Sequence, residues 1–177
     1  WGGVVAALMA QRGFTGADTI LEGERGFMRA FCDQFDEEPL LKDLGINFPI
    51  RIEYKAYSCA RPIHNAIDCA LAIRQEHQPD LEHITAMTMY RHPRWAHYHQ
   101  IAKPRTYHEA QMSLPFSVAV AFKEGEAFWH QYSKENLNNP LIQKMAKMLV
   151  IKPDETLPRG VSCRLIVNMD SGEEFTT

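Results

Sequence analysis

The segment 55–71 constrains the fold most, because a strand-like pattern changes into a helical one within it. Just before it, apolar side chains alternate with other residues at Ile46, Phe48, Ile50, Ile52 and Tyr54. This alternation predicts a half-buried strand over residues 46–54. Within the segment, Ile63, Ile67 and Leu71 recur every fourth residue and predict a helix that starts near Pro62. The sequence therefore predicts a strand, a short loop and a helix in succession.

The loop of this unit carries side chains that suit an anion. Lys55, Arg61 and His64 lie around the predicted start of the helix. Free N–H groups and partial positive charge at a helix N-terminus favour a carboxylate or a phosphate. A lysine after a strand is commonly solvated, and a histidine in a first turn is commonly packed or a cap. A purely structural role is therefore the alternative for each of these side chains.

Three segments of the chain together resemble one enzyme family. They are residues 55–71, residues 104–119, and residues 7–16 continued by 21–23 and 26–27. These segments are similar to parts of the MmgE/PrpD family and follow one another along the chain in the family's order. Members of that family dehydrate 2-methylcitrate, decarboxylate cis-aconitate or epimerise iminodisuccinate. The earliest segment resembles the end of the family's helical domain, and the other two resemble its lid domain. The resemblance implies a lyase or isomerase that needs no cofactor and acts on a small di- or tricarboxylate.

The resemblance also implies how the chain divides into domains. Residues 1–40 correspond to the C-terminal part of the helical domain, and residues 41–177 to an α+β lid domain that is truncated at its C-terminal end. The chain starts at Trp1 in a helix-like pattern and stops at Thr177 in a strand-like one, so we expect a fragment. The full-length protein would be a homodimer, as the family implies.

Roles for individual residues follow from the resemblance as well. Lys55 and His64 match positions of the family's site and are the expected catalytic residues, while Lys55 and Arg61 are expected to bind substrate carboxylates. Cys59 is expected to pack. The family's main acid–base histidines and its aspartate lie in a part of the helical domain outside this chain, so an incomplete active site is expected.

The chain departs from the family pattern at three places. Ala56 and Ser58 replace common prolines, and Phe116 stands where some members that act on tricarboxylates have a tyrosine. The sequence does not distinguish dehydration, decarboxylation and epimerisation. A non-catalytic carboxylate-binding relative, or an interaction module that keeps the lid fold, is the alternative function.

The remaining patterns predict an α+β fold with a mainly antiparallel sheet packed by helices, preceded by helices from the end of an all-α domain. Strands are expected at residues 83–91, 148–151 and 161–168, with a hairpin turn at 170–172 before a last strand. Methionines alternate with other residues in the strand at 83–91, which predicts that both of its faces are covered. Helices are expected at residues 4–12, 27–35, 127–132 and 139–147.

Two of the predicted helices carry a further pattern. In the helix at 27–35, Phe27, Phe31 and Phe35 form an apolar stripe that is typical of a core. Thr106 and Glu109 have the spacing of a capping box and open another helix, in which Pro115 should produce a kink.

Composition excludes several classes of partner. The net charge is −3 with lysines and arginines scattered, so neither nucleic acid nor a membrane surface is expected. No apolar run approaches the roughly 20 residues of a membrane span. The four cysteines lack Cys-x-x-Cys spacing, which predicts reduced thiols in the cytoplasm.

Motifs for metals and cofactors are also missing from the sequence. Histidines cluster loosely at His92, His97, His99 and His108 without a nearby cysteine or a set of carboxylates, so no metal site is expected. No phosphate-binding or dinucleotide-binding glycine motif occurs, in keeping with an enzyme that needs no cofactor.

Overall fold

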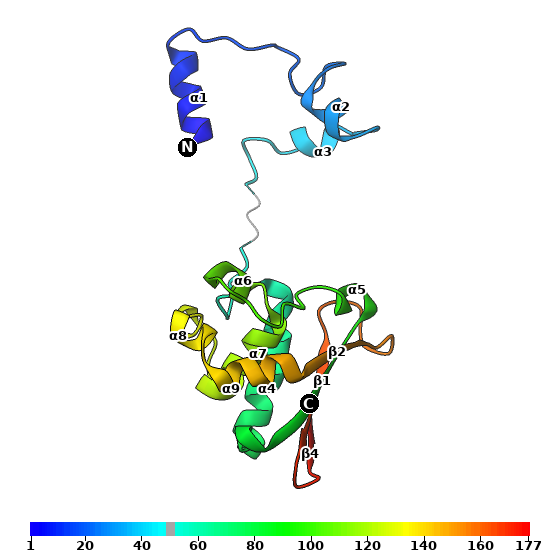
Figure 1. Cartoon of the computed structure of the whole chain (residues 1–177). Coiled ribbons are helices and arrows are strands. Elements are labelled where there is room, and N and C mark those ends of the chain that lie inside the picture. The colour runs from blue at the N-terminus through cyan, green and yellow to red at the C-terminus, as the bar shows by residue number, and fades with distance from the viewer. Residues whose placement is uncertain (49–51) are drawn as a thin grey trace. The chain divides into compact units, whose positions relative to one another are not determined.

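A computed structural model describes residues 1–48 and 52–177 and separates the chain into two compact units, Trp1–Ile52 and Glu53–Thr177 (Figure 1). The helices of the first unit are short: α1 (Gly2–Gln11), α2 (Phe27–Phe31) and α3 (Glu38–Leu41). Within the described residues, all strands lie in the second unit.

Two predictions for the first part of the chain are wrong. The helix expected at 27–35 ends at Phe31. Phe27 and Phe31 are 56% and 74% exposed, and their ring centroids are 4.7 Å apart. A helix of five residues cannot bury such a stripe alone. Residues 46–48 and 52–54 are exposed and form no strand, and residues 49–51 lie outside the described part of the chain. Alternation produces a strand only where a neighbouring strand is available to pair with it.

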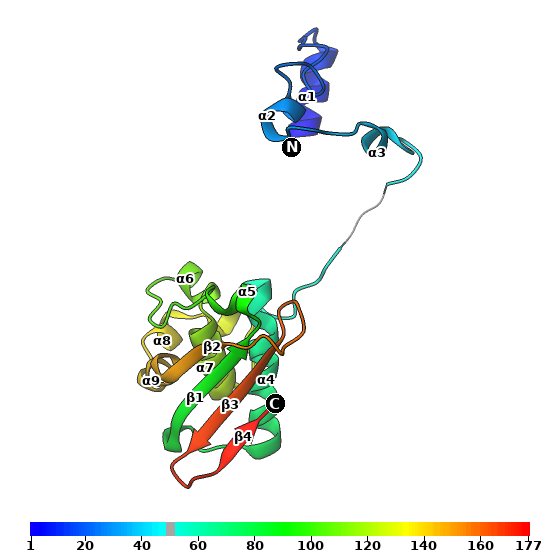
Figure 2. The same ribbon diagram turned by 90° about the vertical axis from the view of Figure 1, so that its right-hand side faces the viewer.

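The second unit is built on a four-stranded sheet. Its strands are β1 (Ile84–Arg91), β2 (Leu149–Pro153), β3 (Cys163–Met169) and β4 (Glu174–Thr176), in the order β2-β1-β3-β4 (Figure 2). β1 pairs with β3 and β3 with β4 in antiparallel fashion, whereas β1 and β2 are parallel. The α+β prediction is confirmed, with one parallel pair. That pair needs a crossover connection, which the helices between β1 and β2 provide.

Helix α7 (Leu114–Glu124) is the centre of the hydrophobic core, since every residue from Leu114 to Phe122 is buried. It packs against α4 (His64–His77) and α9 (Pro140–Met148), and these two helices also contact β3 and β1, respectively. Shorter helices are α5 (Pro93–Ala96), α6 (Tyr107–Gln111) and α8 (Lys134–Leu137). Single turns of 3-10 helix are η1 (Arg61–Ile63), η2 (Leu81–His83) and η3 (Trp129–Gln131).

The sheet is covered on one face within the described chain, so the expectation of two covered faces is wrong. Met87 and Met89 are fully buried under the helices, whereas the alternating residues Thr88 and Tyr90 are only half-buried and Ala86 is exposed. The helices lie on one side of the strands (Figure 2). Methionine on one face therefore marks the core side of a two-layer arrangement.

The expected kink at Pro115 is also wrong. The chain breaks between α6 and α7, and Ser113 caps the second helix through its Oγ, which accepts from the Phe116 N–H at 3.0 Å. Pro115 therefore lies in a first helical turn, where its missing N–H leaves no hydrogen bond unmade.

Candidate functional site

A cavity of about 420 Å³, which we call the Lys55 cavity, lies between the loop before α4 and helix α6. Its lining residues are Lys55, Tyr57, Ser58, Cys59, Ala60, Tyr107, His108, Gln111 and Met112. Among these described residues, Lys55 is the one permanent cation and none is aspartate or glutamate. The cavity therefore offers positive charge and hydrogen-bond donors without a carboxylate that would repel an anion.

Hydrogen bonds fix the loop to α6. The Ala60 N–H donates to the Gln111 carbonyl at 2.9 Å, and Gln111 Nε2 donates to the Ser58 carbonyl at 2.6 Å. The Ser58 N–H donates to the Ala127 carbonyl at 3.3 Å. Because the Ser58 and Ala60 N–H groups are already used inside the protein, these two donors are not free to bind a ligand.

Helix α6 starts where the sequence predicts. Thr106 Oγ1 accepts from the Glu109 N–H at 3.1 Å, as an N-cap does. The Glu109 carboxylate accepts from the Arg105 N–H at 2.6 Å, one residue earlier than in a standard capping box. This start places Tyr107, His108 and Gln111 along the cavity.

Lys55 reaches the cavity from an exposed segment of chain. Its Nζ donates to the Cys59 carbonyl at 3.4 Å, a long hydrogen bond that a ligand carboxylate can replace. The loop that sequence reasoning placed around a helix N-terminus therefore contributes its lysine to a cavity shared with α6.

Tyr57 is a cavity residue that sequence reasoning did not select. Its hydroxyl donates to Asp68 Oδ1 at 2.5 Å, and burial together with this hydrogen bond raises the pKa of Tyr57 well above 10. The phenol therefore stays protonated, and its hydrogen bond to Asp68 fixes the ring in place.

His64 lies beside the cavity without lining it. Its ring meets the Tyr57 ring edge-on, with centroids 5.2 Å apart and planes at 73°. It is 5% exposed, and Nε2 has no hydrogen-bond partner within the described residues. Burial first, and then the charge of Arg61, lower the pKa of His64 below its usual 6.5. The imidazole is therefore neutral at neutral pH and can orient Tyr57.

The other residues expected at the site differ in position. Arg61 is exposed and does not line the cavity. Cys59 does line it and is buried, and burial raises the pKa of its thiol, so the thiol stays protonated and packs as expected. Phe116 is buried in α7 against Tyr132, with centroids 6.1 Å apart, and does not line the cavity.

Arg91, the last residue of β1, holds the turn before α4 and was missed by sequence reasoning. It is fully buried at the end of β1, and its Nη2 donates to the Pro62 carbonyl at 2.7 Å. Its Nη1 donates to the carbonyls of Trp95, at 2.8 Å, and Tyr98, at 3.4 Å. One guanidinium thus ties the turn before α4 to the segment after β1. The available signal was its alternation with Met87 and Met89, which places it on the buried face.

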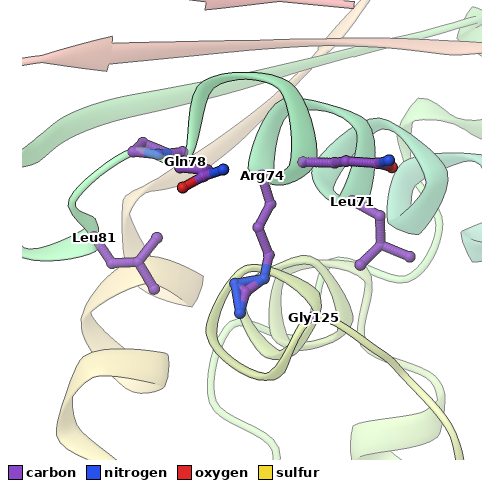
Figure 3. A pocket seen from close by; sticks show the side chains of 7 residues that line it. Leu71, Arg74, Gln78, Leu81 and Gly125 are labelled. Carbon is purple, nitrogen blue, oxygen red and sulfur yellow. The ribbon is translucent and has the colours of Figure 1, made fainter.

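A second cavity, of about 610 Å³, lies where α4 and α7 end (Figure 3). Arg74 extends from α4 toward Gly125, and its Nη1 donates to the Phe122 carbonyl at 3.2 Å. A cation at this place stabilises the last turn of α7. Gly125, at φ +78°, ends that helix, and an added Cβ would lie 3.0 Å from Arg74 Nε. We assign this cavity a structural role because its cation is already used.

Two of the four histidines in the loose cluster, His92 and His99, have local partners. His92 caps α5 by accepting from the Arg94 N–H at 3.2 Å, and His99 Nδ1 lies 3.2 Å from the Met112 carbonyl. Within residues 1–48 and 52–177, no group of three or more His, Cys, Asp or Glu side chains is arranged to hold a metal ion. None of the helices in these ranges is long and apolar enough to cross a membrane.

Comparison with known proteins gives one family match. A family model described as the MmgE/PrpD C-terminal domain matches residues 57–176. The match covers the sheet, its helices and every residue of the Lys55 cavity except Lys55 itself, which lies just before it. Among curated proteins, none matches the chain.

Proposed function

Because the chain belongs to the MmgE/PrpD family, we propose that it is the lid portion of a cofactor-independent lyase or isomerase acting on a small di- or tricarboxylate. The observation that carries this proposal is the Lys55 cavity, which has a lysine, several hydrogen-bonding side chains and no carboxylate among its lining residues. Its volume of about 420 Å³ lies within the range of small-molecule sites.

The three reactions of the family share one chemical requirement. Loss of water, loss of carbon dioxide and inversion next to a carboxylate all move charge or a proton at a carbon beside that carboxylate. A fixed cation and oriented donors lower the barrier if they face the charge as it develops. Lys55 supplies the cation, and Tyr107 and His108 on α6 supply hydrogen-bonding groups beside it.

In this proposal, His64 and Arg61 act around the cavity rather than in it. His64 orients Tyr57 through the contact of their rings. Arg61, exposed in the chain by itself, adds positive charge close to His64 when substrate approaches. In this proposal, the acid–base groups come from the family's helical domain.

The alternative is a carboxylate-binding relative without catalysis. It makes the same prediction for binding to the Lys55 cavity but differs in turnover. A protein that combines this chain with the family's helical domain should be assayed on citrate, 2-methylcitrate, cis-aconitate and iminodisuccinate. Turnover of one of them supports the enzyme, and binding without turnover of any supports the alternative.

The same assay tests the residue roles. In a closed site, removing one partner of a desolvated charge pair costs about 2–5 kcal/mol, so Lys55→Ala should lower kcat/KM by about two to three orders of magnitude. Lys55→Arg should recover only part of the loss, because a planar guanidinium does not replace a compact ammonium. Lys152→Ala, at an exposed position of β2, is the matched control. Unchanged kcat/KM in Lys55→Ala would contradict the proposal.

The assembly and location belong to the same proposal. We place the full-length protein in the cytoplasm as a homodimer, as expected for the family. Sedimentation at several concentrations tests the dimer, and fractionation of cells tests the location.

A further inference from the structure

Two cysteines far apart in the sequence meet between α4 and the sheet. Cys69 lies in α4 and Cys163 begins β3, 94 positions later, with their sulfur atoms 3.6 Å apart. Both side chains are half-buried, so small oxidants can reach them. Their spacing in the sequence gives no sign of this pair, and only the packing of α4 on β3 reveals it.

We propose that Cys69 and Cys163 form an oxidisable dithiol, a modification site that a hydroperoxide converts into a disulfide between α4 and β3. The two sulfur atoms must approach from 3.6 Å to the roughly 2.05 Å of a disulfide bond. Because the two thiols are in contact in the folded chain, one is already in place to attack the other once that one is oxidised. This proposal does not depend on the proposed function.

The surroundings give the two thiols different chemistry. The hydrogen bond from Cys163 lowers the pKa of Cys69 to about 7, against burial and the nearby Asp68 carboxylate, which raise it. The same hydrogen bond, together with burial, raises the pKa of Cys163, and the charge of Arg91 opposes this only in part. Cys69 is therefore the nucleophile, because the thiolate is the reactive form, and Cys163 keeps its proton.

The reaction balances in two steps. The Cys69 thiolate attacks one oxygen of the hydroperoxide and breaks the O–O bond, which gives a sulfenic acid on Cys69 and releases an alkoxide or hydroxide that takes up a proton. The Cys163 sulfur then attacks the sulfenyl sulfur, the S–O bond breaks, and the Cys163 proton leaves with the hydroxyl group as water. Two thiols lose two electrons in total, and the hydroperoxide gains them.

The test uses the whole 177-residue chain and hydrogen peroxide. After treatment, free thiols are alkylated under denaturing conditions and the digest is analysed by mass spectrometry. Two of the four cysteines should resist alkylation, one peptide should contain Cys69 joined to Cys163, and dithiothreitol should reverse both results. The new bond closes a long loop, so the melting temperature should rise by about 5–10 °C.

Single variants test the assignment of the two roles. Cys163→Ser should trap the sulfenic acid on Cys69, which dimedone labels. Cys69→Ser should abolish both the sulfenic acid and the disulfide. Cys32→Ser, at an exposed position of the first unit, is the control and should still form the disulfide. Four alkylated thiols after treatment, oxidation of Cys69 beyond sulfenic acid without a crosslink, or disulfides only through Cys32 would overturn the proposal. If a variant does not fold, the digest of the peroxide-treated chain without substitutions still decides between these outcomes.

Discussion

Replacing Arg91 with methionine tests whether one buried guanidinium holds the loop of the Lys55 cavity. Arg91 has no exposed surface and donates to three carbonyls, two of them at 2.7 and 2.8 Å. A hydrogen bond from a charged donor contributes about 1.5–3 kcal/mol, so the two short bonds together contribute about 3–6 kcal/mol. Removing a buried charge returns part of this as relief of desolvation. We therefore expect Arg91→Met to lower the free energy of unfolding by about 2–4 kcal/mol.

Urea unfolding measures this loss directly. With a slope of about 1.5 kcal/mol per molar, the midpoint should fall by roughly 1.3–2.7 M. Arg159→Met, at an exposed position, should move the midpoint by less than about 0.3 M. Methionine matches much of the arginine volume, so the result reports the hydrogen bonds rather than a new void. An Arg91→Met variant as stable as the parent would show that desolvation cancels the three bonds and that Arg91 does not hold the loop.

Two further predictions concern the core of the second unit and the titration of His64. Phe122→Ala and Leu114→Ala remove fully buried side chains of α7, and each should lower the free energy of unfolding by about 2–5 kcal/mol. Phe128→Ala, at a position that is 48% exposed, should lower it far less. Equal unfolding curves for the three variants would mean that the central helix is misassigned. Because the pKa of His64 is lowered on folding, the unfolded chain binds the extra proton, so stability should be complete above about pH 6.5 and fall as the pH drops below it. Unfolding measured between pH 5 and 8 should show this acid slope, and His64→Gln should reduce it; the same slope in the variant would assign it to other groups.

Local patterns predicted much of the second unit. The stripe at Ile63 and Ile67, the cap at Thr106 and the alternation of 83–91 each depend on neighbours in sequence, and each corresponds to an observed helix or strand. Long-range pairing is not contained in such patterns. Whether β2 lies parallel or antiparallel to β1 depends on how the helices between them cross the sheet.

The candidate site was predictable only in part for the same reason. Lys55 was selected because the loop before a helix is visible in the sequence. The partners on α6 were not selected as site residues, since only the hydrogen bonds between Gln111 and the loop at Ser58 and Ala60 bring them together. The Cys69–Cys163 contact depends in the same way on the packing of a helix against a distant strand.

The most direct test of the central claim is binding of a small tricarboxylate to this chain and to its Lys55→Ala variant. Titration of citrate or cis-aconitate at low ionic strength, followed by NMR, should shift the signals of Tyr107, His108 and Gln111, which line the Lys55 cavity. Because Lys55 is exposed in the chain by itself, its loss should weaken binding by about three- to tenfold, and salt should weaken it further. Lys152→Ala should bind as the parent does. Equal binding by Lys55→Ala, or shifts confined to the cavity around Arg74, would contradict the claim that the Lys55 cavity recognises carboxylates.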